Sequence, residues 1–116
     1  MEKLMNESIL DSVKLLLGID PTYEAFDQSI IMHINSAFMT LWQIGVGPTN
    51  CFAIKDKSTT WSEFTTDNNA LGIVKTYVAK RVRINWDAPT STVVLEALKA
   101  EIAQDEWRMS LLAPAT

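Results

Sequence analysis

The side chains able to do chemistry are few in this sequence and form no catalytic set. There is a single histidine, His33, and a single cysteine, Cys51, which excludes a Cys/His zinc site and an internal disulfide. His33 lies at the edge of an apolar helical stripe, as is typical of a structural histidine hydrogen-bonded at a helix boundary. Pro48 lacks an N–H donor, so the glycines before it predict a helix stop and not a phosphate-binding loop. We expect no catalytic residue, no metal and no cofactor.

The carboxylates have simpler structural roles. Three of them surround the predicted start of the second helix: Asp20, Glu24 and Asp27. Negative charge interacts favourably with a helix dipole there and requires no metal. Asp105 falls within the main apolar stripe of the last predicted helix, so we expect it to pair with a buried base, with Arg81 and Arg83 as the candidates.

A short basic segment interrupts an otherwise acidic chain. The 116 residues have a net charge of −4, but all the charged residues in the segment 71–86 are cations: Lys75, Lys80, Arg81 and Arg83. These cations point to different sides of a helix, whereas a DNA-reading helix presents them on one face. Overall acidity also disfavours a nucleic-acid partner, because phosphate binding needs local cation density. We expect the four cations to meet the acidic first and last helices, within a subunit or between subunits, and regard them as candidate interface residues.

The elements that position these residues are mostly helices. Apolar spacings of three and four residues predict helices over about 6–17, 22–44, 70–86 and 92–112, with Asn6 or Ser8 as the first cap and stops at Gly18 and residues 45–48. Residues 49–66 predict an irregular segment or a short β-hairpin, with one helical turn over 61–64. No apolar run approaches the roughly 20 residues of a membrane span. We expect a mostly α fold, a small bundle of four main helices, in a single domain over residues 1–116.

The second predicted helix has the strongest apolar stripe, and we expect it to be central. The positions expected to be buried are Phe26, Ile30, Ile34, Phe38 and Leu41.

The long helices are apolar on more than one side, and one small core cannot bury all of these faces. The second face of the last helix contains Val93, Ala97, Ala100, Trp107 and Leu111. Either loops and the 49–66 segment cover such faces, or neighbouring subunits do. We expect Ala97, Ala100, Trp107 and Leu111 to make subunit or partner contacts. The alternative is that Trp107 packs on the first helix of its own subunit.

Short stretches along nearly the whole chain occur in a specific order. They are ILDSVK (9–14), LLGID (16–20), FD (26–27), II (30–31), HINS (33–36), QIGVGP (43–48), WSEF (61–64), VKTYV (74–78), DAPTS (87–91) and EWR (106–108). In this order they resemble the small head–tail connector (adaptor, or head-completion) proteins of tailed bacteriophages and prophages. Ala88-Pro89 departs in a minor way from the two prolines that often follow the aspartate in that family.

The resemblance implies a structural virion-assembly protein with no enzymatic activity and no cofactor. It implies a ring of about a dozen copies between the portal protein and the tail or stopper protein, with DNA passing through the lumen without specific binding. Such a protein is made in the host cytoplasm and placed at the head–tail junction of the virion, without contact with a membrane.

An alternative function belongs to another class: a small helical DNA-binding or regulatory protein that uses the basic helix over 70–86. Salt-dependent DNA binding by the purified protein would favour this alternative.

Overall fold

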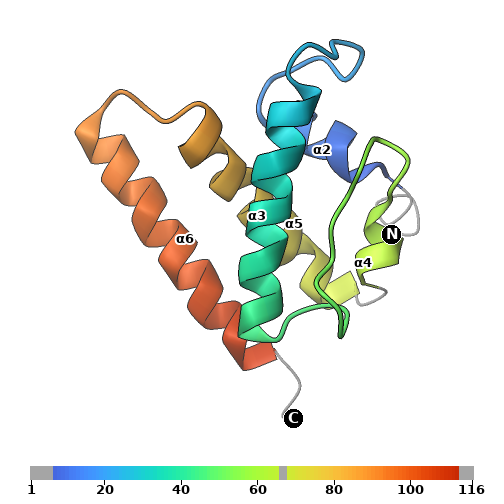
Figure 1. The fold of residues 1–116 in the computed structure, drawn as a ribbon. Coiled ribbons are helices and arrows are strands. Elements are labelled where there is room, and N and C mark those ends of the chain that lie inside the picture. The colour runs from blue at the N-terminus through green and yellow to red at the C-terminus, as the bar shows by residue number, and fades with distance from the viewer. Residues whose placement is uncertain (1–6, 66–67, 113–116) are drawn as a thin grey trace.

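The structure is a computed structural model, which describes residues 7–65 and 68–112. These residues form five helices: α2 (Ile9–Leu16), α3 (Asp27–Ile44), α4 (Trp61–Phe64), α5 (Asn68–Trp86) and α6 (Thr92–Leu112). In Figure 1, α5 crosses behind α3, and α6 lies to the side of both. Strand pairing within the described residues is limited to one antiparallel bridge between Ser8 and Thr60. The predicted helical bundle is confirmed, and residues 49–60 form an irregular segment instead of a hairpin.

The caps of α2 follow from its sequence. The Ser8 side chain accepts a hydrogen bond from the Asp11 N–H, which satisfies one of the free donors of the first turn. Gly18 has φ 81°, the left-handed conformation that favours glycine after a helix. Asn6, the other proposed cap, lies outside the described residues.

The start of α3 differs from the prediction. The helix begins at Asp27, well after the predicted start near residue 22. The backbone carbonyls of Pro21 and Tyr23 accept hydrogen bonds from Lys14 Nζ at 3.0 and 2.7 Å, so this stretch of chain bends toward α2. Phe26 therefore precedes the helix and is 44% exposed, and the expectation that it is buried is wrong.

The core is centred on α3 and α5. The other four positions predicted to be buried on α3 are fully inaccessible: Ile30, Ile34, Phe38 and Leu41. α3 is central as expected, but α5 shares that position, because each of the two packs against α2, α6 and the other.

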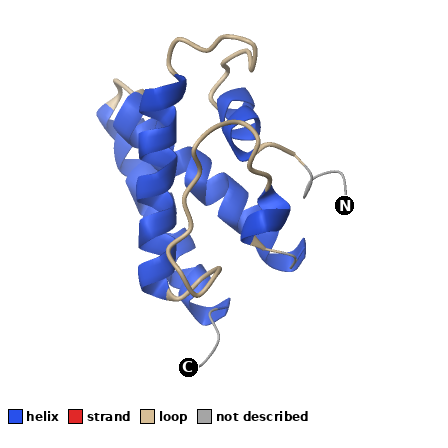
Figure 2. Ribbon diagram, turned by 45° about the vertical axis from the view of Figure 1, so that its right-hand side comes forward, coloured by secondary structure: helices blue, strands red, loops and turns tan. Residues whose placement is uncertain are grey.

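The irregular segment and α4 close the side of α3 that the other helices leave open, as Figure 2 shows. Asn35 on α3 holds this segment through its side-chain amide, whose NH2 group donates to the Ile54 carbonyl at 3.0 Å and whose oxygen accepts from the Ile54 N–H at 2.8 Å. On the far side, the buried Trp61 indole donates to the Ser12 hydroxyl of α2 at 2.8 Å. The short helices α2 and α4 thus stabilise each other across a large separation in sequence.

No helix within the described ranges combines the length and the hydrophobicity required to span a bilayer.

Candidate interaction surfaces

The potentially reactive side chains lie apart from one another. His33 is half-buried in the middle of α3 and has no hydrogen bond within the described part of the chain, so the predicted bond at a helix boundary is wrong. Cys51 is exposed on the irregular segment. Across residues 7–65 and 68–112, no group of three His, Cys, Asp or Glu side chains is arranged to hold a metal ion.

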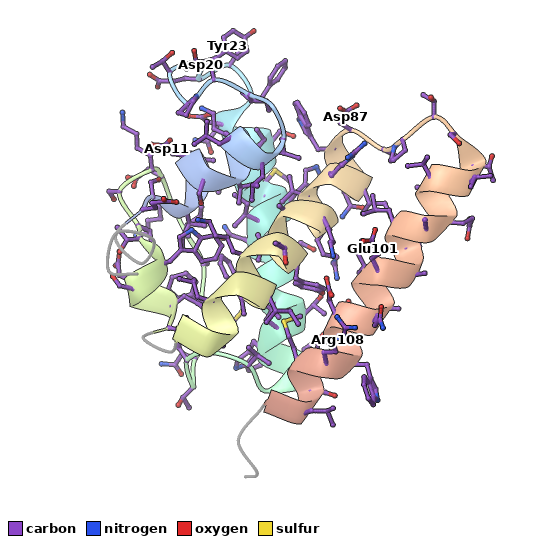
Figure 3. The ribbon with its side chains drawn as sticks, turned by 180° about the vertical axis from the view of Figure 1, so that it is seen from behind. Asp11, Asp20, Tyr23, Asp87, Glu101 and Arg108 are labelled. Atoms are coloured by element: carbon purple, nitrogen blue, oxygen red, sulfur yellow. The ribbon has the colours of Figure 1, made fainter. Side chains whose placement is uncertain are left out.

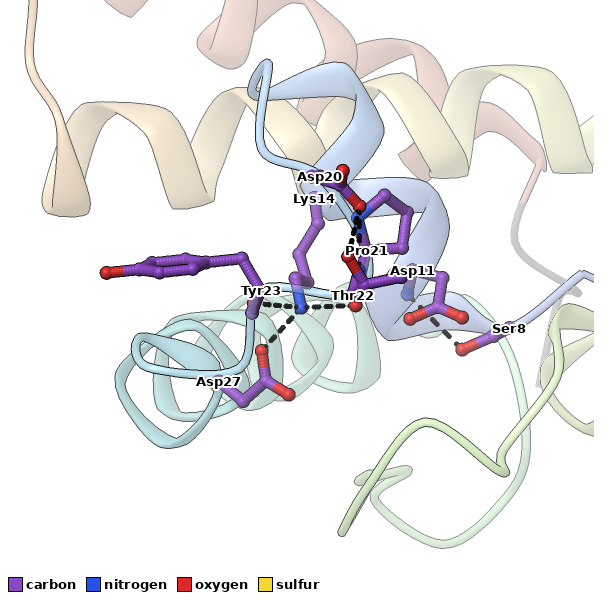
Figure 4. Close-up of polar contacts among 8 residues, drawn as sticks. All are labelled: Ser8, Asp11, Lys14, Asp20, Pro21, Thr22, Tyr23 and Asp27. Atoms are coloured by element: carbon purple, nitrogen blue, oxygen red, sulfur yellow. Dashed lines mark hydrogen bonds and ion pairs between the residues drawn. The ribbon is translucent and has the colours of Figure 1, made fainter.

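A buried lysine organises the turn before α3 (Figure 4). Lys14 is fully inaccessible, and its Nζ also donates to Asp27 Oδ1 at 2.7 Å. Of the three acids predicted near this helix start, Asp27 alone lies in the first turn of α3. Asp20 accepts hydrogen bonds from the Thr22 N–H and hydroxyl, and these bonds lower the pKa of its carboxyl group.

Three of the four candidate basic residues pair within the subunit. Lys75 contacts Glu7, which precedes α2, at 2.8 Å, and Lys80 contacts Asp105 on α6 at 2.9 Å. Arg81 lies 3.4 Å from Glu106, also on α6. Three cations of α5 therefore meet acids of the first and last parts of the chain.

The base that pairs with Asp105 is Lys80. The expectation that Arg81 or Arg83 would pair with it is therefore wrong. Arg81 follows Lys80 by one residue and so points about 100° further around the helix, toward Glu106. Arg83 is exposed and makes no hydrogen bond or ion pair with any described residue. It remains available to a partner.

Tyr77 links α5 and α6 within this polar contact. Its ring is inaccessible, and its hydroxyl donates to Glu106 at 2.7 Å while accepting from Arg81 at 3.1 Å. Burial, together with the hydrogen bond to the Glu106 carboxylate, raises the pKa of Tyr77 well above its usual value. The contact between α5 and α6 is thus substantially polar.

The outer face of α6 has no cover within the described chain. Trp107 is 63% exposed, Leu111 67% and Val93 79%, and Ala97 and Ala100 between them are also exposed. Figure 3 shows side chains of α6 pointing away from the other helices. Packing of Trp107 on the first helix, the alternative considered above, is therefore wrong, and this apolar face is open to a partner.

A second open face lies on α3, which is one of the long helices predicted to be apolar on more than one side. Met32 is 71% exposed and Met39 is 52% exposed, on the side opposite the buried stripe. The spacing of uncharged residues at 29, 32, 36, 39 and 43 could have indicated this face.

An open groove of about 280 Å³ lies between α2, α5 and α6. Its lining includes Leu16, Ala79, Leu98 and Arg83. Its lining also contains the polar side chains Thr76, Lys80 and Glu101.

These features define a small helical protein whose surfaces are suited to binding other macromolecules. A family model described as "Phage connector protein" matches residues 9–115, which is nearly the whole chain. The chain belongs to this family, and the resemblance found in the sequence is confirmed. It is a structural connector protein of a bacteriophage. No curated protein and no solved structure matches it.

Proposed function

We propose that the protein forms a ring at the head–tail junction of the virion, between the portal protein and the tail or stopper protein. The observation that carries the proposal is the uncovered apolar face of α6, which a monomer would leave in water. Heterologous contacts between identical subunits generate closed rings when the rotation between neighbours closes. A connector that repeats such a contact encloses a channel for DNA.

The contact residues proposed on α6 are Ala97, Ala100, Trp107 and Leu111. Two alanines let another backbone approach closely, and Trp107 is an anchor of the type enriched at interface hot spots. Of the four candidate cations on α5, Arg83 is the one that pairs with no described residue, so it can contact a neighbour. Lys75, Lys80 and Arg81 support the contact indirectly, because their ion pairs hold α2 and α6 against α5.

The net charge of −4 also suits a channel for DNA, since it disfavours retention of the phosphate backbone. The DNA-binding alternative has less support, because three of the four cations it would use are paired inside the subunit.

The test is assembly on the portal protein of the same phage. The purified protein is mixed with portal rings and examined by negative-stain electron microscopy and native mass spectrometry. We expect a ring of about a dozen copies on one end of the portal. In parallel, a phage with a stop codon in this gene should accumulate filled heads without tails. Normal virions from that phage, or no association with the portal, would overturn the proposal.

A further inference from the structure

Two exposed stripes on different helices share the same spacing and the same lack of charge. On α6 the stripe consists of Val93, Ala97, Ala100, Gln104, Trp107 and Leu111. On α3 it consists of Ser29, Met32, Ser36, Met39 and Gln43. We call these the α6 stripe and the α3 stripe. Alternating steps of three and four residues are the pattern of a helix seam that packs along another helix.

Each stripe faces directly away from the subunit core. At 100° per residue, the α3 stripe is centred on the side of the helix opposite Ile30, Ile34 and Leu41, which are inaccessible. The α6 stripe is likewise nearly opposite Leu98, Ile102 and Met109, which are buried. Packing within the subunit therefore leaves both seams free.

We propose that the α6 stripe of one copy packs along the α3 stripe of the next copy. This inference rests on the proposed ring and names the surface that receives α6. The charge pattern favours it, because neither stripe contains a charged side chain, so the contact buries no unpaired charge. A contact between two different faces of one chain is heterologous and repeats from copy to copy, whereas pairing of α6 with α6 stops at a dimer and leaves the α3 stripe exposed.

The side-chain sizes on the two stripes also complement each other. Ala97 and Ala100 leave room on α6 for the methionines of α3, whose unbranched side chains adapt to irregular gaps. The serines of the α3 stripe leave room for the large Trp107 ring.

A single contact of this kind is weak. Two helices of this length bury roughly 1,000 Å² or less together, which is at the low end for specific protein interfaces. The free protein is then monomeric at micromolar concentration, and the ring forms when the portal holds the copies at high local concentration.

Cysteine cross-linking tests the contact. In a Cys51→Ser background, Met39→Cys places a thiol on the α3 stripe and Ala100→Cys places one on the α6 stripe. Lys99→Cys is the matched control, since it lies on α6 outside the stripe. Each protein is assembled on portal rings, treated with a short bis-maleimide, and analysed by denaturing gel, with circular dichroism confirming the fold.

We expect chains that contain both Met39→Cys and Ala100→Cys to give a ladder of dimers, trimers and larger products. An equal mixture of the two single variants should give dimers. Each single variant alone should give no more product than the Lys99→Cys control.

Other outcomes contradict the inference in distinguishable ways. Dimers from Ala100→Cys alone would show that α6 pairs with α6. Rings visible by microscopy with no cross-linking above the control would place the ring contact elsewhere and leave the proposed function intact. If the wild-type protein forms no ring, the proposed function fails, and the same cross-linking at millimolar concentration without portal decides the contact by itself.

Discussion

Lys14 is the residue on which the turn between α2 and α3 depends. It binds two backbone carbonyls and the Asp27 carboxylate from a fully buried position. Removing one partner of such a pair leaves the other groups without compensation, which costs more than the pair itself contributes.

We predict that Lys14→Met lowers the free energy of unfolding by about 3 kcal/mol, because Asp27 and both carbonyls lose their shared donor. Urea denaturation followed by circular dichroism measures the change. Lys57→Met, at an exposed position of the irregular segment, is the control and should change stability by less than about 0.5 kcal/mol. Equal effects of the two substitutions would contradict this account of the turn.

Tyr77 makes the free energy of unfolding depend on pH in the alkaline range. Because its pKa is raised in the folded state, the unfolded chain loses this proton first, near the usual tyrosine value of about 10. The contribution of Tyr77 is therefore complete below pH 10 and declines as the pH rises above it, by up to about 1.4 kcal/mol per pH unit.

We predict that Tyr77→Phe costs about 1–2 kcal/mol at pH 8, because the hydrogen bond to the Glu106 carboxylate is lost. This cost should shrink between pH 10 and 11 in urea titrations of both proteins. A cost that stays constant over this range would mean that Tyr77 ionises equally easily in both states.

At the scale of elements, two glycines with positive φ have different surroundings. A Cβ on Gly47, where φ is 98°, would lie 2.6 Å from ring atoms of Phe64 on α4. A Cβ on Gly18, where φ is 81°, would meet no atom within 4 Å.

We predict that Gly18→Ala costs about 1 kcal/mol, for the left-handed backbone alone, and Gly47→Ala about 2–3 kcal/mol, since the Phe64 ring must also move. Gly72→Ala should instead stabilise by about 0.5–1 kcal/mol, because Gly72 is an exposed helical residue of α5 with open space around it. Thermal unfolding of the three variants gives the order, and Gly47→Ala no worse than Gly18→Ala would contradict the close approach of α4.

The elements were predictable where local chemistry determines them. Ser8, Gly18 and Gly45 end or begin helices through their own backbone and side chains, and the sequence places these boundaries correctly. The start of α3 was not predictable. Pro21 and Thr22 have the sequence pattern of a helix start, but the carbonyls of Pro21 and Tyr23 accept hydrogen bonds from Lys14 instead of from a helix. That interaction depends on tertiary structure, which the helical periodicity does not contain.

The same distinction applies to the candidate surfaces. The apolar second face of α6 is visible in the spacing of its residues, but the exposure of Trp107 and the burial of Trp61 follow from how the helices pack. Likewise, Lys80 and Arg81 are neighbours in the sequence, and the packing of α5 on α6 decides which of them binds Asp105 and which binds Glu106.

At the scale of the whole molecule, a substitution of the exposed Trp107 can test assembly without disturbing folding. We predict that Trp107→Glu leaves the melting temperature of the free protein within about 2 °C, since the side chain is mostly in water. The same variant should fail to form rings on the portal and fail to rescue a phage that lacks the gene. Lys99→Glu, on the same helix, is the matched control and should assemble. A Trp107→Glu protein that is unstable, or that assembles normally, would contradict the assignment of this face to a partner.

The polar character of the contact between α5 and α6 has a consequence for motion. α6 is held by a few buried apolar side chains and by ion pairs that dissolved salt screens, and it joins α5 through the short link at residues 87–91. Its amide hydrogens should therefore exchange with solvent through local opening, faster than those of α3 and faster still in concentrated salt. The contacts that salt weakens are the ones that hold α6, the helix proposed to meet the neighbouring copy, against α5. A change in the tilt of α6 can therefore adapt each copy to its place in the proposed ring while the core around α3 stays closed.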